Sequence, residues 1–143
     1  MAKILVSACL IGCDCRYIGD SFRNEAVRDL AKNHTLIPVC PEQLGGLTTP
    51  RLPSERQGEK VVMVDGTDVT AQFAKGAENA LEIAKLMNVD FAILKAHSPS
   101  CGKGMIYDGS FSGVLTERDG VPLEYLKSHG IEVFGESEID KLI

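Results

Sequence analysis

Cysteine is the residue type in this chain that is best suited to chemistry, and its five copies are unevenly spread, at Cys9, Cys13, Cys15, Cys40 and Cys101. An odd number of widely separated thiols is unlike the paired framework of a small secreted protein that is held by disulfides. In a reducing compartment such thiols serve as metal ligands, catalysts or small apolar core residues. The place of each thiol in the fold therefore decides between these roles.

Three of the thiols follow segments that have the pattern of buried strands. Apolar runs with β-branched residues predict these strands over residues 4–8, 35–39 and 91–94. Parallel strands bring their carboxyl ends to one edge of a sheet, where open α/β proteins bind ligands. We therefore expect Cys9, Cys40 and Cys101 to converge at this edge. The alternative is that the three thiols follow strands by accident, because buried cysteine is common.

The segments between these strands complete the predicted fold. A helix is predicted from Thr70 to Met87, where apolar residues recur at the helical period and Thr70 is the cap. The other predicted elements are helices over 24–32 and 122–129, a loop over 44–57, a hairpin over 60–69 with its turn at Asp65-Gly66, a loop with a short strand over 102–121, and a last strand over 131–134. This alternation predicts an α/β fold: a single domain over residues 1–143 with three layers, a mostly parallel, Rossmann-like sheet and a β-hairpin insertion.

Charge and hydropathy exclude several classes of protein. The chain has 143 residues, with 15 Lys and Arg against 20 Asp and Glu, and a formal net charge of -5. This balance argues against a nucleic-acid partner, because phosphate binding needs a basic surface. No apolar run approaches the ~20 residues that span a bilayer, so no membrane partner is expected. The first residues are interpreted as a strand and not as a signal peptide, which predicts a cytoplasmic protein.

Converging thiolates suit either a soft metal ion or an iron–sulfur cluster. A structural zinc ion would need a fourth ligand, for which His97, Cys13 and Cys15 are candidates. A four-iron cluster held by three cysteines would instead leave one iron open, and an open metal can act in catalysis. Both alternatives remain open at this level.

Oxygen-bearing side chains flank two of the cysteines. Glu42 comes two residues after Cys40, and Ser98 and Ser100 come just before Cys101. A carboxylate and hydroxyls beside a metal centre can transfer protons. The alternative is that Glu42 is a solvated loop residue and that the serines only form a turn around the proline between them.

Five sequence blocks together resemble the signature of one family. They are Ser7-Ala8-Cys9-Leu10-Ile11-Gly12 with Cys15-Arg16-Tyr17; Cys40-Pro41-Glu42-Gln43-Leu44-Gly45-Gly46-Leu47 with Thr49-Pro50-Arg51 and Glu55; Asp65-Gly66 with Asp68-Val69-Thr70; Leu94-Lys95 with Ser98-Pro99-Ser100-Cys101-Gly102; and Ile106-Tyr107-Asp108-Gly109-Ser110-Phe111. Over nearly its whole length the chain is similar to the family called domain of unknown function 523, which includes the TudS-like thiouracil desulfidases.

The resemblance implies a cofactor, a substrate class and a set of site residues. The cofactor would be a [4Fe-4S] cluster with three ligands, Cys9, Cys40 and Cys101, and one open iron. The substrate would be a small thiolated molecule such as 2-thiouracil or a related thioamide, its sulfur bound by the open iron. Water would attack the carbon with help from Glu42 and Ser98, without net electron transfer, and Ser100 is the alternative serine.

The sequence also allows a second function and other roles for several residues. The rival function is a non-catalytic module that binds iron, zinc or sulfide, which needs the cysteines but neither Glu42 nor the serines. Cys13 is expected to be a loop or core thiol, whereas Cys15 belongs to a family block and is expected to support the site. Arg51 is expected either to bind a substrate oxygen or to brace its own loop through Glu55.

Overall fold

The computed structural model describes residues 1–97 and 101–142. Its centre is a four-stranded sheet of the order β2-β1-β5-β8, in which all neighbouring strands are parallel. The strands are β1 (Lys3–Ser7), β2 (Thr35–Val39), β5 (Phe91–Leu94) and β8 (Val133–Gly135). β1 pairs with both β2 and β5. The three strands that precede Cys9, Cys40 and Cys101 are therefore neighbours.

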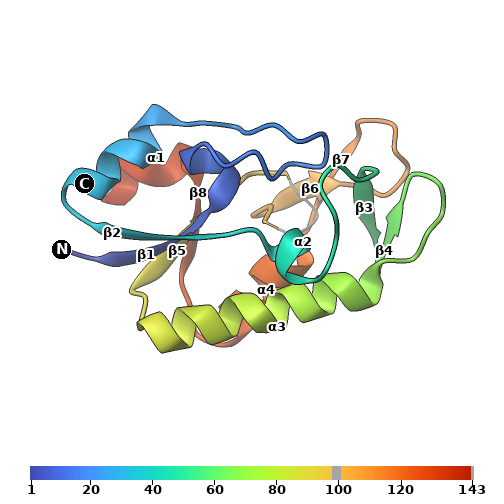
Figure 1. Cartoon of the computed structure of the whole chain (residues 1–143). Coiled ribbons are helices and arrows are strands. Elements are labelled where there is room, and N and C mark those ends of the chain that lie inside the picture. The colour runs from blue at the N-terminus through green and yellow to red at the C-terminus, as the bar shows by residue number, and fades with distance from the viewer. Residues whose placement is uncertain (98–100, 143) are drawn as a thin grey trace.

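Helical segments cover both faces of this sheet (Figure 1). α3 (Thr70–Met87) and α4 (Val121–Ser128) lie on one face, and α1 (Glu25–Asp29), η1 (Ala8–Ile11) and η3 (Glu136–Leu142) lie on the other. Successive side chains of β1 point to the two faces of the sheet in turn. Leu5 shares an apolar cluster with Leu81 and Leu123, whereas Ile4 shares one with Val27. The predicted three-layer α/β fold with a parallel sheet is confirmed.

The long helix α3 spans the predicted residues, but Thr70 does not cap it. Thr70 is the first residue of the helix, and the N-cap position belongs to Val69. The Thr70 hydroxyl instead accepts a hydrogen bond from the backbone N–H of Val61 at 2.9 Å. The capping prediction was wrong because this hydroxyl joins the helix to the neighbouring strand β4 (Lys60–Met63).

The hairpin prediction was wrong about the partner strand. β4 pairs in antiparallel fashion with β3 (Ser54–Gln57), which lies in the segment predicted as a loop. Beyond the turn at Asp65-Gly66, the chain returns to β4 only as an isolated bridge between Val62 and Asp68. β3 escaped prediction because its inward side chains are Ser54 and Arg56, which are polar although they are buried.

The remaining short elements follow the prediction more closely. α1 continues into η2 (Leu30–Lys32), and α4 begins one residue earlier than predicted. A second hairpin, of β6 (Met105–Tyr107) and β7 (Leu115–Glu117), occupies the region predicted as a loop with a short strand. The sequence did not predict α2 (Pro41–Leu44). Among the described residues, no helix is long and apolar enough to cross a membrane.

Candidate functional site

A cavity of about 540 Å³ opens at the carboxyl edge of the parallel sheet. Its wall contains four thiols, from Cys9, Cys15, Cys40 and Cys101, and two carboxylates, from Glu42 and Glu55. The cavity lies where the connections change direction across the sheet: the first leads from β1 to β2 on one side, and the connection from β2 leads back past β1 to β5 on the other. Such a switch point is where open α/β sheets bind their ligands. The convergence expected from the strand ends is therefore present in the structure.

Close backbone packing positions the segment that carries Cys40 and Glu42. Cys40 occupies the N-cap position of α2, and Glu42 lies in the first turn of that helix. α2 packs against α3 through Gly76, where an added Cβ atom would lie 1.9 Å from the carbonyl oxygen of Pro41. A larger residue cannot occupy this position without moving α2, so a glycine of the long helix sets the place of both site residues.

The thiols lie close enough to influence one another. The hydrogen bond with Cys40 lowers the pKa of Cys15, but the hydrogen bond with Cys9, burial and the neighbouring thiols outweigh it and raise this pKa to about 11. The hydrogen bond with Cys15 and burial also raise the pKa of Cys40. These thiols are therefore protonated at neutral pH, and a metal centre that bound them would displace their protons.

The donor set at this site fits an iron–sulfur cluster. Thiolate sulfur is the soft ligand that such clusters require, and the thiols of Cys9, Cys40 and Cys101 all line the one cavity. Within residues 1–97 and 101–142, no three His, Cys, Asp or Glu side chains gather tightly enough to hold a metal ion as they stand. None of the five cysteines, all within the described residues, forms a disulfide.

An almost buried ion pair orients Glu42. Arg51 Nε donates to Glu42 Oε1 at 3.1 Å, and the two side chains are 4% and 14% exposed. Arg51 Nη2 also donates to the carbonyl oxygen of Cys15 at 3.0 Å. Arg51 braces its own loop, as expected, but through the Thr48 carbonyl oxygen at 3.2 Å and the Thr49 hydroxyl at 2.9 Å, and not through Glu55. Glu55 accepts instead from the backbone N–H of Gly109, at 3.0 Å. Arg51 thus connects the carboxylate to the segment that carries Cys15.

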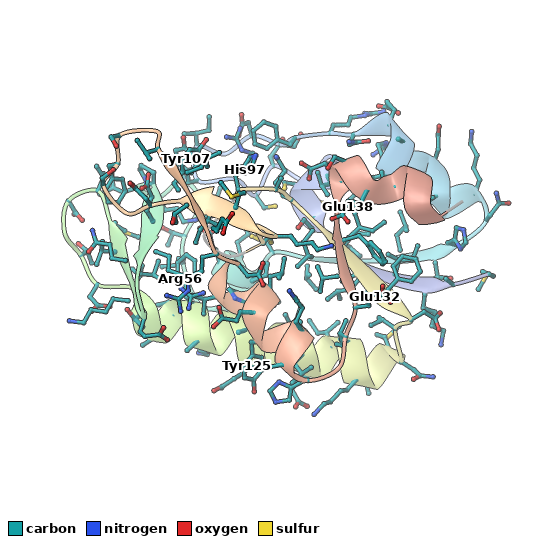
Figure 2. All side chains as sticks on the ribbon, turned by 180° about the vertical axis from the view of Figure 1, so that it is seen from behind. Arg56, His97, Tyr107, Tyr125, Glu132 and Glu138 are labelled. Carbon is teal, nitrogen blue, oxygen red and sulfur yellow. The ribbon has the colours of Figure 1, made fainter. Side chains whose placement is uncertain are left out.

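Aromatic side chains and cations also line the wall. Phe22, Tyr107 and His97 line the cavity, and the rings of His97 and Tyr107 lie near each other (Figure 2), 6.4 Å apart between centroids. Cations of Arg16 and Lys95 lie over the Phe22 ring, at 3.7 and 4.5 Å from its centroid. Lys95 could be placed at the site from the sequence because it directly follows the strand β5, whereas Phe22 lies in a long loop and had no such signal.

One polar group of the wall lacks a partner. The Ser54 hydroxyl is buried and, among the described residues, forms no hydrogen bond. Buried hydroxyl groups are nearly always hydrogen-bonded, so an unpaired one beside a cavity calls for an explanation. A polar group of a bound ligand would provide one.

The structure thus brings together most of the predicted site residues. Cys9, Cys40, Cys101 and Glu42 line the same cavity, and so does Cys15. Two further predicted residues, Ser98 and Ser100, lie outside the described residues. The exposed thiol is that of Cys13, consistent with its expected place in a loop.

Comparisons with known proteins assign a class to this arrangement. A family model described as 2-thiouracil desulfurase matches residues 4–138. YbbK of Bacillus subtilis (strain 168), described as an uncharacterized protein, is 41% identical over 150 residues, which cover 98% of this chain and 99% of YbbK. A solved structure of the [4Fe-4S]-dependent thiouracil desulfidase TudS matches with a TM-score of 0.92 and 46% identity, covering 99% of this chain and 95% of that one.

The fold and its thiol-lined cavity define a Rossmann-like α/β protein with a sulfur-rich site at the switch point of its sheet. The chain belongs to the 2-thiouracil desulfurase family. The resemblance found in the sequence blocks is therefore confirmed, as is the prediction of an enzyme, since the family is named for an enzymatic activity.

Proposed function

We propose that this protein is a [4Fe-4S]-dependent desulfidase that replaces the thiocarbonyl sulfur of a small heterocycle, such as 2-thiouracil, with oxygen. The observation that carries the proposal is the convergence of four thiols and the Arg51-held Glu42 in a single cavity. The family match and the similarity to a [4Fe-4S]-dependent desulfidase support it. In this proposal the substrate is a small molecule, and the protein has no nucleic-acid or membrane partner.

In this proposal Cys9, Cys40 and Cys101 hold the cluster through thiolate ligands, and Cys15 supports them from the same wall. When bound, the cluster supplies an open iron that acts as a Lewis acid toward the substrate sulfur. The raised pKa values of Cys15 and Cys40 mean that assembly of the centre must release protons.

Glu42 is the proposed general base. Arg51 holds the carboxylate on the cavity wall, where it takes a proton from the attacking water. The new C–O bond forms as the C–S bond breaks, and the products are a carbonyl compound and hydrogen sulfide. No electrons are gained or lost, so the reaction needs no external reductant. Ser98 is proposed to donate or relay the second proton, with Ser100 as the alternative serine.

The character of the wall supports a flat, aromatic substrate. Tyr17, Phe22, Tyr107 and Phe111 all line the cavity, and aromatic side chains pack well against planar rings. The unpaired Ser54 hydroxyl offers a hydrogen bond to a ring oxygen or nitrogen. We propose that the physiological substrate belongs to the class of flat, thiolated aromatic rings.

A non-catalytic module that stores or transfers iron, zinc or sulfide is the second candidate function. The cluster of thiols favours it as much as it favours catalysis. A binding module gives no role to Glu42. The orientation of Glu42 by an almost buried arginine is better explained by a catalytic function. Either function fits the proposed cytoplasmic location, because thiols that form no disulfide persist in reducing compartments.

Anaerobic reconstitution tests this proposal. The parent protein should bind about four irons per chain and absorb broadly near 400 nm, as expected for a four-iron cluster. It should also release sulfide from 2-thiouracil or a related thioamide. The variants Cys9→Ser, Cys40→Ser and Cys101→Ser should lose the cluster, and Cys13→Ser, which changes an exposed thiol, is the matched control. A fully loaded protein inactive on a broad panel of thiolated bases and thioamides would leave only the binding module.

Variants of the proton-transferring residues separate catalysis from binding. Glu42→Gln keeps the size of the side chain but removes the base, so it should retain iron and lose at least ~100-fold in the rate of sulfide release. Ser98→Ala should behave in the same way, and Ser100→Ala should lose less. A Glu42→Gln variant that desulfurises at the parent rate with a full cluster would exclude this residue as the base.

A further inference from the structure

The segment that follows Cys101 is tied to the chain just before α4. The backbone N–H of Gly120 donates to the carbonyl oxygen of Gly102 at 2.7 Å. The carboxylate of Asp119 accepts, through Oδ1, from the backbone N–H of Gly104 at 2.7 Å. Two neighbouring residues, 119 and 120, thus hold two backbone groups close after the buried Cys101.

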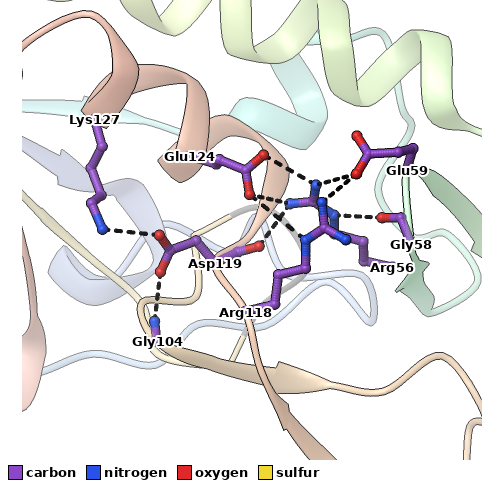
Figure 3. A network of polar contacts seen from close by, with 8 residues as sticks. All are labelled: Arg56, Gly58, Glu59, Gly104, Arg118, Asp119, Glu124 and Lys127. Atoms are coloured by element: carbon purple, nitrogen blue, oxygen red, sulfur yellow. Dashed lines mark hydrogen bonds and ion pairs between the residues drawn. The ribbon is translucent and has the colours of Figure 1, made fainter.

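Asp119 is itself fixed from the side of the hairpin β3–β4 (Figure 3). Arg56, which is only 4% exposed, donates through Nη1 to the carbonyl oxygen of Asp119 at 2.8 Å. The same guanidinium pairs with Glu124 of α4, at 3.1 Å between Nη1 and Oε2. Lys127 donates to the second carboxylate oxygen of Asp119 at 3.0 Å, but its side chain is 46% exposed. The buried contact, and not the surface pair, is the firm support of Asp119.

We infer that Asp119 is a positioning residue for Cys101, which acts by holding the backbone N–H of Gly104. A hydrogen bond to a charged acceptor is stronger than one between neutral groups, so this contact limits how far the thiol can move. Groups behind a metal ligand commonly fix its position in this way. The significance of Cys101 as a cluster ligand rests on the proposed function, but the contact itself can be tested without any cluster.

Alkylation of the cluster-free, reduced protein by iodoacetamide measures how often Cys101 becomes accessible. The reaction at a buried thiol requires a local opening, so its rate reports the population of the open form. Asp119→Ala removes the acceptor of the Gly104 N–H and should raise the alkylation rate of Cys101 about tenfold, the change expected from losing one charged hydrogen bond. Mass spectrometry of the labelled peptides gives this rate for each cysteine.

Cys15 is the internal control, because it is also buried in the cavity wall but lies on a different segment. A general loss of stability would accelerate labelling of both thiols, whereas loss of the proposed contact accelerates that of Cys101 alone. Asp119→Asn keeps an acceptor oxygen and should stay within about threefold of the parent rate at Cys101. Lys127→Ala removes only the surface pair and should match the parent rate.

Equal acceleration at Cys15 and Cys101, no acceleration at Cys101, or an Asp119→Asn variant as fast as Asp119→Ala would each overturn the inference. In reconstituted protein, Asp119→Ala should also lose iron to a chelator about tenfold faster than the parent. A parent chain that takes up no iron would contradict the proposed function, while the alkylation result would still decide whether Asp119 holds Cys101 in place.

Discussion

Two sides of the cavity are supported by different kinds of contact. On the side of Cys40, the backbones of α2 and α3 touch at Gly45 and Gly76, and the amide of Asn79 donates to the Leu44 carbonyl at 2.8 Å. On the side of Cys101, support comes from charged groups around the buried Arg56 (Figure 3). The first side is held mainly by close packing of two helix backbones, and the second is held by hydrogen bonds and ion pairs.

The two kinds of support should respond differently to substitution. The contacts of α2 with α3 place Cys40 close to the sheet mainly by steric fit. The hairpin side has an apolar cluster of only three buried residues, Val61, Val69 and Phe73. Arg56 adds hydrogen bonds to the carbonyl oxygens of Gly58 and Asp119. The two sides should therefore fail in different ways: the first through steric clash, the second through loss of a buried charge and its partners.

Removal of the buried cation should have the largest effect. Arg56→Met keeps much of the side-chain volume but leaves the carbonyl oxygens of Gly58 and Asp119 unpaired, and it should lower the free energy of unfolding by about 3 kcal/mol. Urea unfolding gives this value. The matched control is Arg118→Met, since Arg118 is 32% exposed and pairs with the same Glu124, and its cost should stay below about 1 kcal/mol. Similar losses in the two variants would show that burial of Arg56 is not what stabilises this side.

A methyl group at Gly76 tests the steric side. Alanine favours a helix by ~1 kcal/mol over glycine, but its Cβ atom would collide with the Pro41 carbonyl. Gly76→Ala should therefore lower the free energy of unfolding by about 2 kcal/mol, as overpacking does, and it should reduce iron uptake because it displaces Cys40. Circular dichroism during urea unfolding and an iron assay measure the two effects.

The exposed Lys75 of the same helix supplies the control for Gly76. Lys75→Ala gives the same new residue without a neighbour to clash with, and its stability should change by less than about 0.5 kcal/mol. If Gly76→Ala proved as stable as Lys75→Ala, close packing of α2 on α3 would not be what places Cys40.

The two sides also differ in how well the sequence predicts them. The strands β1, β2 and β5 and the helix α3 follow from apolar periodicity, because burial on the sheet faces imposes that pattern. The convergence of Cys9, Cys40 and Cys101 on one cavity follows in turn from the rule for parallel strand ends. Local pattern and chain topology suffice for these strands and for α3, but not for α2, which has only four residues and therefore no apolar periodicity.

The hairpin side could not be predicted in the same way. β3 has the sequence pattern of a polar segment, because Arg56 takes the place of an apolar core residue. The partners of Arg56, Asp119 and Glu124, lie far along the chain. The ion pair of Arg51 with Glu42 likewise depends on which loops meet in three dimensions, and neither of the two expected partners of Arg51, a substrate oxygen or Glu55, pointed to it. Polar contacts between distant segments leave no periodic signal, so they emerge only from the folded structure.

The smallest predicted effect concerns Thr70, which joins the two sides. Its hydroxyl accepts from the N–H of Val61 at 2.9 Å and so connects the start of α3 to the hairpin strand β4. The hydroxyl also donates a longer hydrogen bond, of 3.4 Å, to the Val61 carbonyl oxygen. Thr70→Val keeps the shape of the side chain but removes both contacts, and it should lower the free energy of unfolding by about 1 kcal/mol, the net value of one well-formed hydrogen bond. Thr70→Ser keeps the hydroxyl and loses a methyl group, so it should cost less than Thr70→Val. Urea unfolding of both variants separates the hydroxyl from the methyl contribution. A Thr70→Ser variant that loses as much as Thr70→Val, or more, would contradict this order and show that packing of the methyl group contributes at least as much as the hydroxyl to the connection between the two sides.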